Sequence, residues 1–196
     1  MRTLARVLPL GLVAVMLFAP GATPAALALD VPVEITATAY APSAVTTSLG
    51  GSVTWTNHSG EPQTTLSNQG FFYPLLDHGT EVTLGFEHAG TFAYHSQENP
   101  TMHGAVRVPL KAPAGAANGF TLRWSAVGSF TDQRTFDVQK KAPGTTTWTS
   151  YRSNTTARSA FLNPTRNGTW RFRARTDNVS NGQYSGWSPV KLVKVS

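Results

Sequence analysis

Residues 94–108, YHSQENPTMHGAVRV, decide how the first half of the chain is expected to fold. Apolar and polar residues alternate at both ends of the stretch, as they do in half-buried strands. Between these ends, polar residues surround a proline, which favours a short loop. The loop ends at Met102, and His95 and His103 stand on either side of it. The stretch therefore predicts two strands joined by a loop whose surroundings hold side chains of metal-binding type.

Similar short runs, rich in Val, Thr, Phe, Tyr and Trp, recur along the chain between clusters of Gly, Pro, Asn and Ser. This pattern is typical of antiparallel strands, and neither half shows sustained helical periodicity. The strands expected in the first half are 33–40, 52–57, 81–86, 91–96 and 104–110. Those expected in the second half are 120–127, 134–141, 146–152, 169–176 and 190–196. The sequence thus predicts an all-β protein built as two tandem Greek-key β-sandwiches.

The first 28 residues have the pattern of a secretory signal peptide. Arg2 and Arg6 precede the apolar run LPLGLVAVMLFA, and Ala26-Leu27-Ala28 fits a cleavage site. An uncleaved anchor is the alternative, although the run is shorter than a membrane-spanning helix needs. We therefore expect a secreted, extracellular protein without a transmembrane segment after cleavage, either free or associated with the cell envelope.

Charge divides the remaining chain into two parts. Residues 29–109 carry seven acidic residues against one basic residue, a net charge of −6, and residues 110–196 carry thirteen basic against three acidic residues, a net charge of +10. The change falls near the Pro-, Ala- and Gly-rich stretch VPLKAPAGAANG. We expect a first domain at 29–109, a linker or strand lead-in at 110–118, and a second domain at 119–196.

The first part resembles the cupredoxins, of the plastocyanin and amicyanin type found in exported bacterial proteins. The resemblance rests on GSVTWTN at 51–57, the F…LL…G spacing over 71–79, FEHAGTFAYHS at 86–96 and NPTMHGAVRV at 99–108. It implies a copper site made of two histidines, one cysteine and one axial methionine. The matching positions hold Gln63, Ser96, Asn99 and Met102, so only the methionine is retained.

Because the chain has no cysteine, thiolate ligation and the blue copper centre that depends on it are excluded. Two interpretations of the histidines stay open. His58, His95, Met102 and His103 could hold copper in another way, because imidazole and thioether groups bind Cu(I) and imidazoles bind Cu(II). Alternatively they are solvated loop residues, and no cofactor is bound. Strand alternation predicts that His95 points away from the pocket that Ser96 faces.

The second part resembles a fibronectin type III domain. GFTLRWSAV matches the second strand, with Trp124 as the buried tryptophan, and LNPTRNGTWRFRARTDNVSNGQYSGWSPV matches the late strands. Trp170 takes the place of the tyrosine that usually begins the late strand. The resemblance implies a seven-stranded spacer or binding module without catalysis.

Arginines alternate in TWRFRAR, so Arg171, Arg173 and Arg175 are expected on one face of a strand. Trp187 follows nearby and could stack between them. Such a face suits an anionic cell-wall polymer, a glycan or a protein partner. The alternatives are a self-contained structural ladder, or contact between this basic half and the acidic half.

No serine-hydrolase elbow, zinc-protease helix or phosphate-binding loop is present, so we expect no enzymatic activity. Nucleic acid is not expected as a partner because no reading motif accompanies the basic charge. The leading hypothesis is a secreted, non-enzymatic binding or surface-associated protein. The rival hypothesis is a copper-binding, metal-handling protein of the cupredoxin family.

Overall fold

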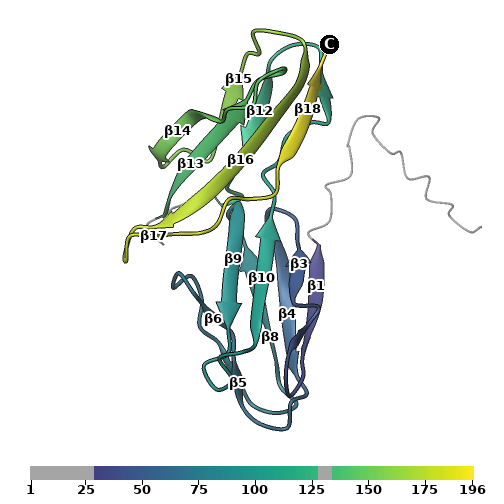
Figure 1. Ribbon diagram of the computed structural model, residues 1–196, viewed down its shortest axis with the longest axis vertical. Helices are drawn as coiled ribbons and strands as arrows, with labels where there is room; N and C mark the ends of the chain where they lie inside the picture. Colours follow the sequence, from purple (N-terminus) through teal and green to yellow (C-terminus); the bar gives the residue numbers. More distant parts are fainter. Residues whose placement is uncertain (1–28, 128–133) are drawn as a thin grey trace, which may run out of the picture.

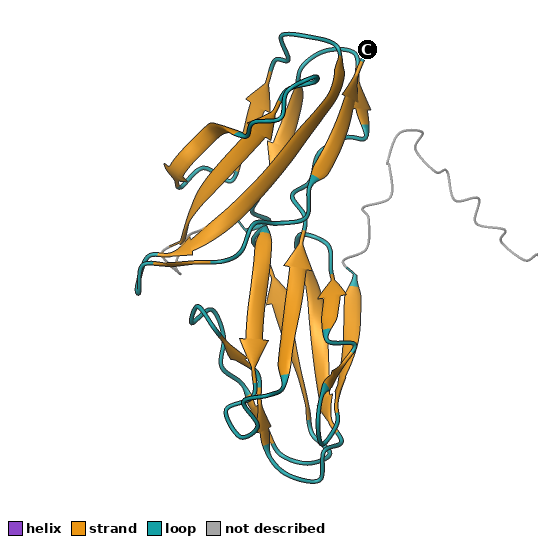
Figure 2. Cartoon of the chain, viewed as in Figure 1, coloured by secondary structure: helices purple, strands orange, loops and turns teal. Residues whose placement is uncertain are grey.

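The computed structural model describes residues 29–127 and 134–196, and the expected signal peptide at 1–28 lies outside this range. Regular structure in the described residues is all strand (Figure 2). The strands form two β-sandwiches placed end to end (Figure 1). The all-β fold class predicted from the sequence is therefore confirmed. Within the described ranges, no helix is long and apolar enough to cross a membrane.

Two four-stranded sheets make up the first sandwich. One has the order β2-β1-β4-β8, and its strands are β2 (Tyr40–Ala41), β1 (Asp30–Ile35), β4 (Gly51–Asn57) and β8 (Glu81–Phe86). The other has the order β3-β10-β9-β6, and its strands are β3 (Ala44–Thr46), β10 (His103–Val108), β9 (Gly90–His95) and β6 (Leu66–Ser67). A separate short pair joins β5 (Gln63–Thr64) to β7 (Leu75–Leu76). The β1–β4 and β3–β10 pairs are parallel.

The core of the first sandwich is aromatic because the inward positions of its alternating strands carry large rings. Trp55 and Tyr94 are almost completely buried, and the Trp55 indole N–H donates to the Tyr94 hydroxyl over 3.1 Å. Burial raises the pKa of Tyr94 to about 12, so this hydroxyl stays protonated. Opposite Tyr94 in the β9–β10 register stands Gly104, where a Cβ atom would lie 2.2 Å from the tyrosine ring. The glycine therefore makes room for the ring.

The second sandwich has one large and one small sheet. The large sheet has the order β11-β18-β16-β13-β14, with β17 paired to β16, and its strands are β11 (Gly115–Ala116), β18 (Lys191–Val195), β16 (Gly168–Asn178), β13 (Arg134–Lys141), β14 (Thr149–Thr155) and β17 (Gln183–Tyr184). The small sheet pairs β12 (Phe120–Arg123) with β15 (Ser159–Leu162). Trp124 and Trp170 are buried between the sheets, and the Trp170 indole N–H donates to the Arg166 carbonyl over 3.1 Å.

Hydrogen bonds between neutral groups join the two sandwiches. Thr91 and Gly186 exchange backbone hydrogen bonds of 2.9 and 2.8 Å, and the Ala89 N–H donates to the Trp124 carbonyl over 2.9 Å. The Asn178 amide donates to the carbonyls of Gln69 and Gly70. The described junction thus combines backbone pairing with side-chain hydrogen bonds between neutral groups.

This junction explains why one expected strand is shorter in the structure. Strand β12 ends at Arg123 instead of continuing to residue 127. Trp124 accepts its hydrogen bond from Ala89 of the first sandwich, and Ala126 donates to the Glu87 carbonyl. The Trp124 carbonyl and the Ala126 N–H therefore bond to the first sandwich, while the Trp124 N–H still bonds to the Arg158 carbonyl. The periodicity of one segment cannot reveal such bonds.

Candidate functional site

The positions that match copper ligands lie at the end of the first sandwich that faces away from the second (Figure 1). The buried Ser96 hydroxyl lies 2.7 Å from Gln63 Oε1 and 3.1 Å from Glu98 Oε2. It also accepts a 3.2 Å hydrogen bond from the Asn99 backbone N–H. A hydroxyl has one proton and two lone pairs, so these three neighbours use most of its bonding capacity. Side chains from different loops therefore satisfy one another here.

Glu98 closes this polar cluster from its exposed side. Its Oε2 atom accepts hydrogen bonds from the Thr64 N–H and the Thr64 hydroxyl, over 2.7 and 2.8 Å. Partial burial by itself would raise the pKa of Glu98, but the hydrogen bonds from Thr64, its own backbone N–H and Ser96 together lower it. The carboxylate thus stabilises the loop in its charged form. We call Gln63, Thr64, Ser96, Glu98 and Asn99 the polar cluster.

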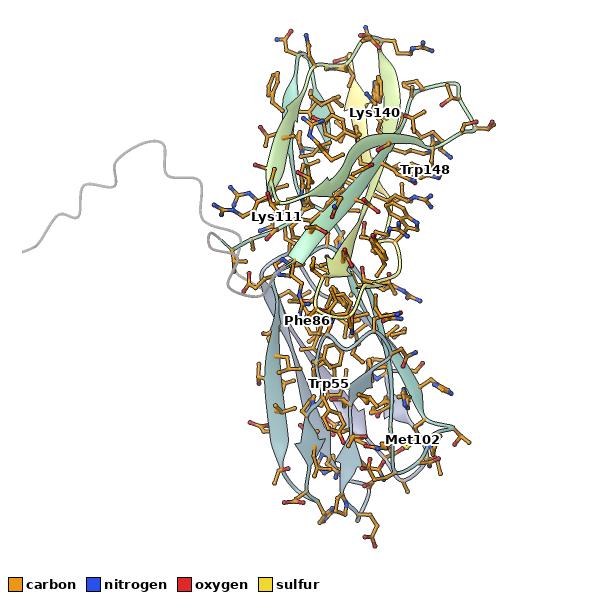
Figure 3. The ribbon with its side chains drawn as sticks, turned by 90° about the vertical axis from the view of Figure 1, so that its left-hand side faces the viewer. Trp55, Phe86, Met102, Lys111, Lys140 and Trp148 are labelled. Carbon is orange, nitrogen blue, oxygen red and sulfur yellow. The ribbon has the colours of Figure 1, made fainter. Side chains whose placement is uncertain are left out.

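The polar cluster does not fit the type 1 copper centre that the cupredoxin resemblance implies. Such a centre needs two imidazoles and a thiolate, and serine and carboxamide groups are poor substitutes. The hydroxyl of Ser96 and the carbonyl oxygen of Gln63 already bond to each other. Met102, labelled at this end in Figure 3, is 1% exposed, and the chain has no cysteine to supply a thiolate beside it. Among residues 29–127 and 134–196, no three histidine or acidic side chains gather as a metal-binding group.

The four residues predicted as an alternative copper set are not brought together. His58 Nε2 lies 2.7 Å from Glu34 Oε2, and Met102 faces the core. His95 and His103 do meet, because they are directly opposite in the β9–β10 register, and their ring centroids are 6.3 Å apart. As strand alternation predicted, Ser96 is buried while His95 is on the outer face. Only half of the predicted set is therefore adjacent.

The predicted arginine face lies on β16 in the second sandwich. Arg173 stacks on Trp187 at 4.5 Å and on Trp148 at 4.4 Å, measured from the guanidinium carbon to the ring centroid. Arg175 lies 4.9 Å from the Trp187 centroid and 4.1 Å from that of Tyr184. The rings and guanidinium groups therefore alternate. We call this row, Lys141, Trp148, Arg173, Trp187, Arg175 and Tyr184, the cation–aromatic ladder.

Side chains of the neighbouring strand β13 fix the two arginines by hydrogen bonds. The Asp137 carboxylate accepts two hydrogen bonds from Arg175, at 3.0 and 2.8 Å, and Gln139 Oε1 accepts two from Arg173, at 3.0 and 2.7 Å. Arg175 is thus neutralised by a carboxylate, whereas Arg173 is held by an uncharged amide. Burial first, and repulsion from Arg175 second, lower the pKa of Arg173. A guanidinium group stays charged at neutral pH even so, and because Gln139 is uncharged it does not neutralise the charge of Arg173.

Sequence analysis found only part of this site. It predicted Arg173, Arg175 and Trp187, which are in contact, and also Arg171, which makes no ring contact among the described residues. It missed Trp148, which lies near the start of β14 and comes into contact through the β13–β14 hairpin (Figure 3). It also missed Tyr184. The signal available in the sequence was that both missed residues are aromatic. Using it requires knowing which segments lie beside β16, and this depends on the register between strands.

Comparisons with known proteins found similar solved structures only. No protein-family model matches the sequence, and no curated protein does. Among solved structures, a purple cupredoxin from Nitrosopumilus maritimus is 28% identical, with 40% of this chain and 99% of that chain covered and a TM-score of 0.38. A reduced amicyanin variant is 27% identical over 40% of this chain and 81% of its own, with a TM-score of 0.36.

A second amicyanin variant, in its reduced Cu(I) form, is 25% identical, covers 45% of this chain and 86% of its own, and has a TM-score of 0.36. The solved structures to which part of this chain is similar thus include cupredoxins. The resemblance of the second half to fibronectin type III domains stays a prediction.

Proposed function

We propose that this is a secreted, non-enzymatic binding protein whose second sandwich docks an anionic polymer of the cell envelope. The observation that carries the proposal is the cation–aromatic ladder, which holds Arg173 and Arg175 side by side on the outer face of β16. Stacked guanidinium groups are already fixed in place, so binding them to an anion costs little further side-chain entropy. The first sandwich serves as a scaffold with exposed loops.

Charge on this face favours an anionic partner. Strand alternation puts Lys141 and Arg171 on the same side as the two stacked arginines. Among the residues that the structure describes, the acidic residues on this side are Asp137, which pairs with Arg175, and Asp177, which is 8% exposed. Positive charge thus exceeds accessible negative charge. A repeating polyanion would also relieve the repulsion between Arg173 and Arg175, because its charges would lie beside both.

The surroundings of Ser96 support a role without catalysis. Its hydroxyl is fully buried and contacts Gln63, Glu98 and Asn99, whereas the adjacent His95 side chain bonds to Asn68. A nucleophilic serine needs a base within hydrogen-bond reach and access to substrate. Electron transfer through a type 1 copper centre is not proposed either, because the polar cluster does not fit that metal.

Binding to isolated cell-wall sacculi tests the proposal. The purified protein is titrated against sacculi before and after acid extraction of their anionic polymers, at low and high salt. We expect binding that weakens with salt, since charges at the surface are screened over about 8–10 Å at ordinary ionic strength. We expect extraction of the polymers to abolish it.

A matched pair of variants separates the ladder from general basic charge. Arg173→Gln/Arg175→Gln should weaken binding about tenfold or more, a loss of about 1.4 kcal/mol. Arg123→Gln/Arg166→Gln removes the same charge from exposed positions outside the ladder, and should weaken binding only about twofold. Equal losses in the two variants would show that the ladder is not the binding site, and binding that survives polymer extraction would exclude an anionic wall polymer.

A further inference from the structure

We propose that His95 and His103 form a two-imidazole binding site for a divalent transition metal on the outer face of the first sandwich. This site is separate from the positions that match type 1 copper ligands, and it does not depend on the proposed polymer binding. Three features of the structure support it: the register of the two histidines, the spacing of their rings, and the hydrogen bond that orients His95.

Register places the two side chains on the same face. His95 is the last residue of β9, His103 is the first of β10, and the two are direct partners in this antiparallel pair. The adjacent pair, Ser96 and Met102, is joined by a 3.2 Å backbone hydrogen bond from Ser96 N–H to the Met102 carbonyl. The histidines therefore occupy a non-hydrogen-bonded pair, in which opposing side chains approach most closely.

The spacing of the rings suits a shared metal ion. An imidazole nitrogen binds zinc at about 2.0–2.1 Å, and the ring centroid lies about 1.1 Å beyond that nitrogen, so two rings on one metal have centroids up to about 6.4 Å apart. The centroids of His95 and His103 are 6.3 Å apart, with an angle of 50° between the ring planes. Because that upper limit needs the two nitrogens on opposite sides of the ion, rotations about the side-chain bonds must bring the centroids to about 5 Å apart for both rings to bind a tetrahedral ion.

Asn68 prepares His95 for metal binding. Asn68 follows β6, and its side-chain oxygen lies 2.7 Å from His95 Nδ1. A carboxamide oxygen only accepts, so the Nδ1–H donates to it, and the other ring nitrogen, Nε2, carries the free lone pair. An oxygen that orients a histidine in this way is the usual outer partner of a metal ligand.

The neighbourhood leaves the metal accessible. Along the two strands, the next residues on the same face are Ala93 and Ala105, which have small side chains, and Leu66 of β6 lies beside His95 on its other side. His103 is exposed and His95 is partly exposed. Two protein ligands leave other coordination positions to water, so binding should be moderate. The order of affinity should follow the general series for nitrogen ligands, with Cu(II) bound more tightly than Ni(II) or Zn(II).

Calorimetric titration of the purified protein with Cu(II), and separately with Zn(II), tests the site. We expect one equivalent of Cu(II) bound more tightly than Zn(II), with two nitrogen ligands in the electron paramagnetic resonance spectrum. His95→Ala and His103→Ala should each weaken Cu(II) binding at least tenfold. Asn68→Ala should weaken it about tenfold while the two ligands remain, as loss of an outer partner typically does.

His58→Ala is the matched control, because His58 is also an exposed histidine with a polar partner, Glu34. This substitution should leave the affinity and stoichiometry of Cu(II) binding unchanged. The proposal is overturned if the His95→Ala/His103→Ala double variant binds Cu(II) as the parent protein does, or if His58→Ala abolishes binding. Selective broadening of the His95 and His103 ring signals by substoichiometric Cu(II) in NMR spectra provides an independent readout, because it does not depend on how a variant folds.

Discussion

The polar cluster of the first sandwich and the cation–aromatic ladder of the second both collect side chains from separate segments of the chain, but these side chains bond in opposite ways. In the cluster, the buried Ser96 hydroxyl bonds to Gln63, Glu98 and Asn99. In the ladder, Arg173 and Arg175 stack on rings and remain partly exposed.

The difference follows from burial. A buried polar atom without a partner costs about 1–3 kcal/mol, so the cluster must satisfy its atoms internally. A guanidinium group at the surface can stack on a ring and still expose its N–H edge to a partner. The cluster is therefore closed to ligands in its present form, whereas the ladder stays open to them.

Rebuilding the first region should give the largest effect. The Gln63→His/Ser96→Cys/Asn99→His variant would place a thiolate and two imidazoles where the Ser96 hydroxyl and Gln63 Oε1 now lie 2.7 Å apart, with Met102 buried nearby. We expect it to bind Cu(II) with the intense visible absorption of a copper–thiolate bond, which the parent protein lacks.

Visible spectra during Cu(II) titration check this prediction, and the Ser96→Cys variant alone serves as its control. A colourless triple variant that is folded would show that the loop holds its backbone in a shape unsuited to copper.

Replacing one polar side chain in each region should lower the free energy of unfolding for different physical reasons. Ser96→Ala leaves Gln63 Oε1 without its hydroxyl partner in a buried place, so the free energy of unfolding should fall by about 1–3 kcal/mol. Arg173→Gln removes two ring contacts, each worth about 0.5–1 kcal/mol at an exposed site, so it should cost at most about 2 kcal/mol.

Urea unfolding measures both changes, with Ser153→Ala at an exposed position as the control. If Arg173→Gln costs more than Ser96→Ala, the ladder is mainly a structural element, and the contrast between the two regions fails.

The smallest effect concerns pH. Because hydrogen bonds keep the pKa of Glu98 below its usual value of 4.5, the folded protein favours the carboxylate more than the unfolded chain does. This stabilising contribution is complete above the unfolded-state pKa and is lost as pH falls through the lower folded-state pKa. The free energies of unfolding of the parent protein and Glu98→Gln, measured between pH 6 and pH 3 at about half-unit steps, should therefore converge as pH falls. If the two free energies keep a constant difference over this range, Glu98 has the same pKa in the folded and unfolded states.

Local patterns predicted the strands well where apolar and polar residues alternate within the segment itself. The stretch at 91–96 became β9, and 134–141 became β13 with the same bounds. Prediction failed where a segment's partners lie far along the chain. Trp124 leaves β12 because its carbonyl bonds to Ala89, and Trp148 joins the ladder only through the β13–β14 hairpin.

The sequence by itself determined the all-β class, the absence of a thiolate ligand and the alternation that puts Ser96 inside and His95 outside, because these depend on residue type and the two-residue period of a strand. Only the tertiary structure decided which side chains meet: His95 with His103, His58 with Glu34, and Arg173 with Trp148. Register between strands sets these contacts, and register depends on the packing of the whole sandwich.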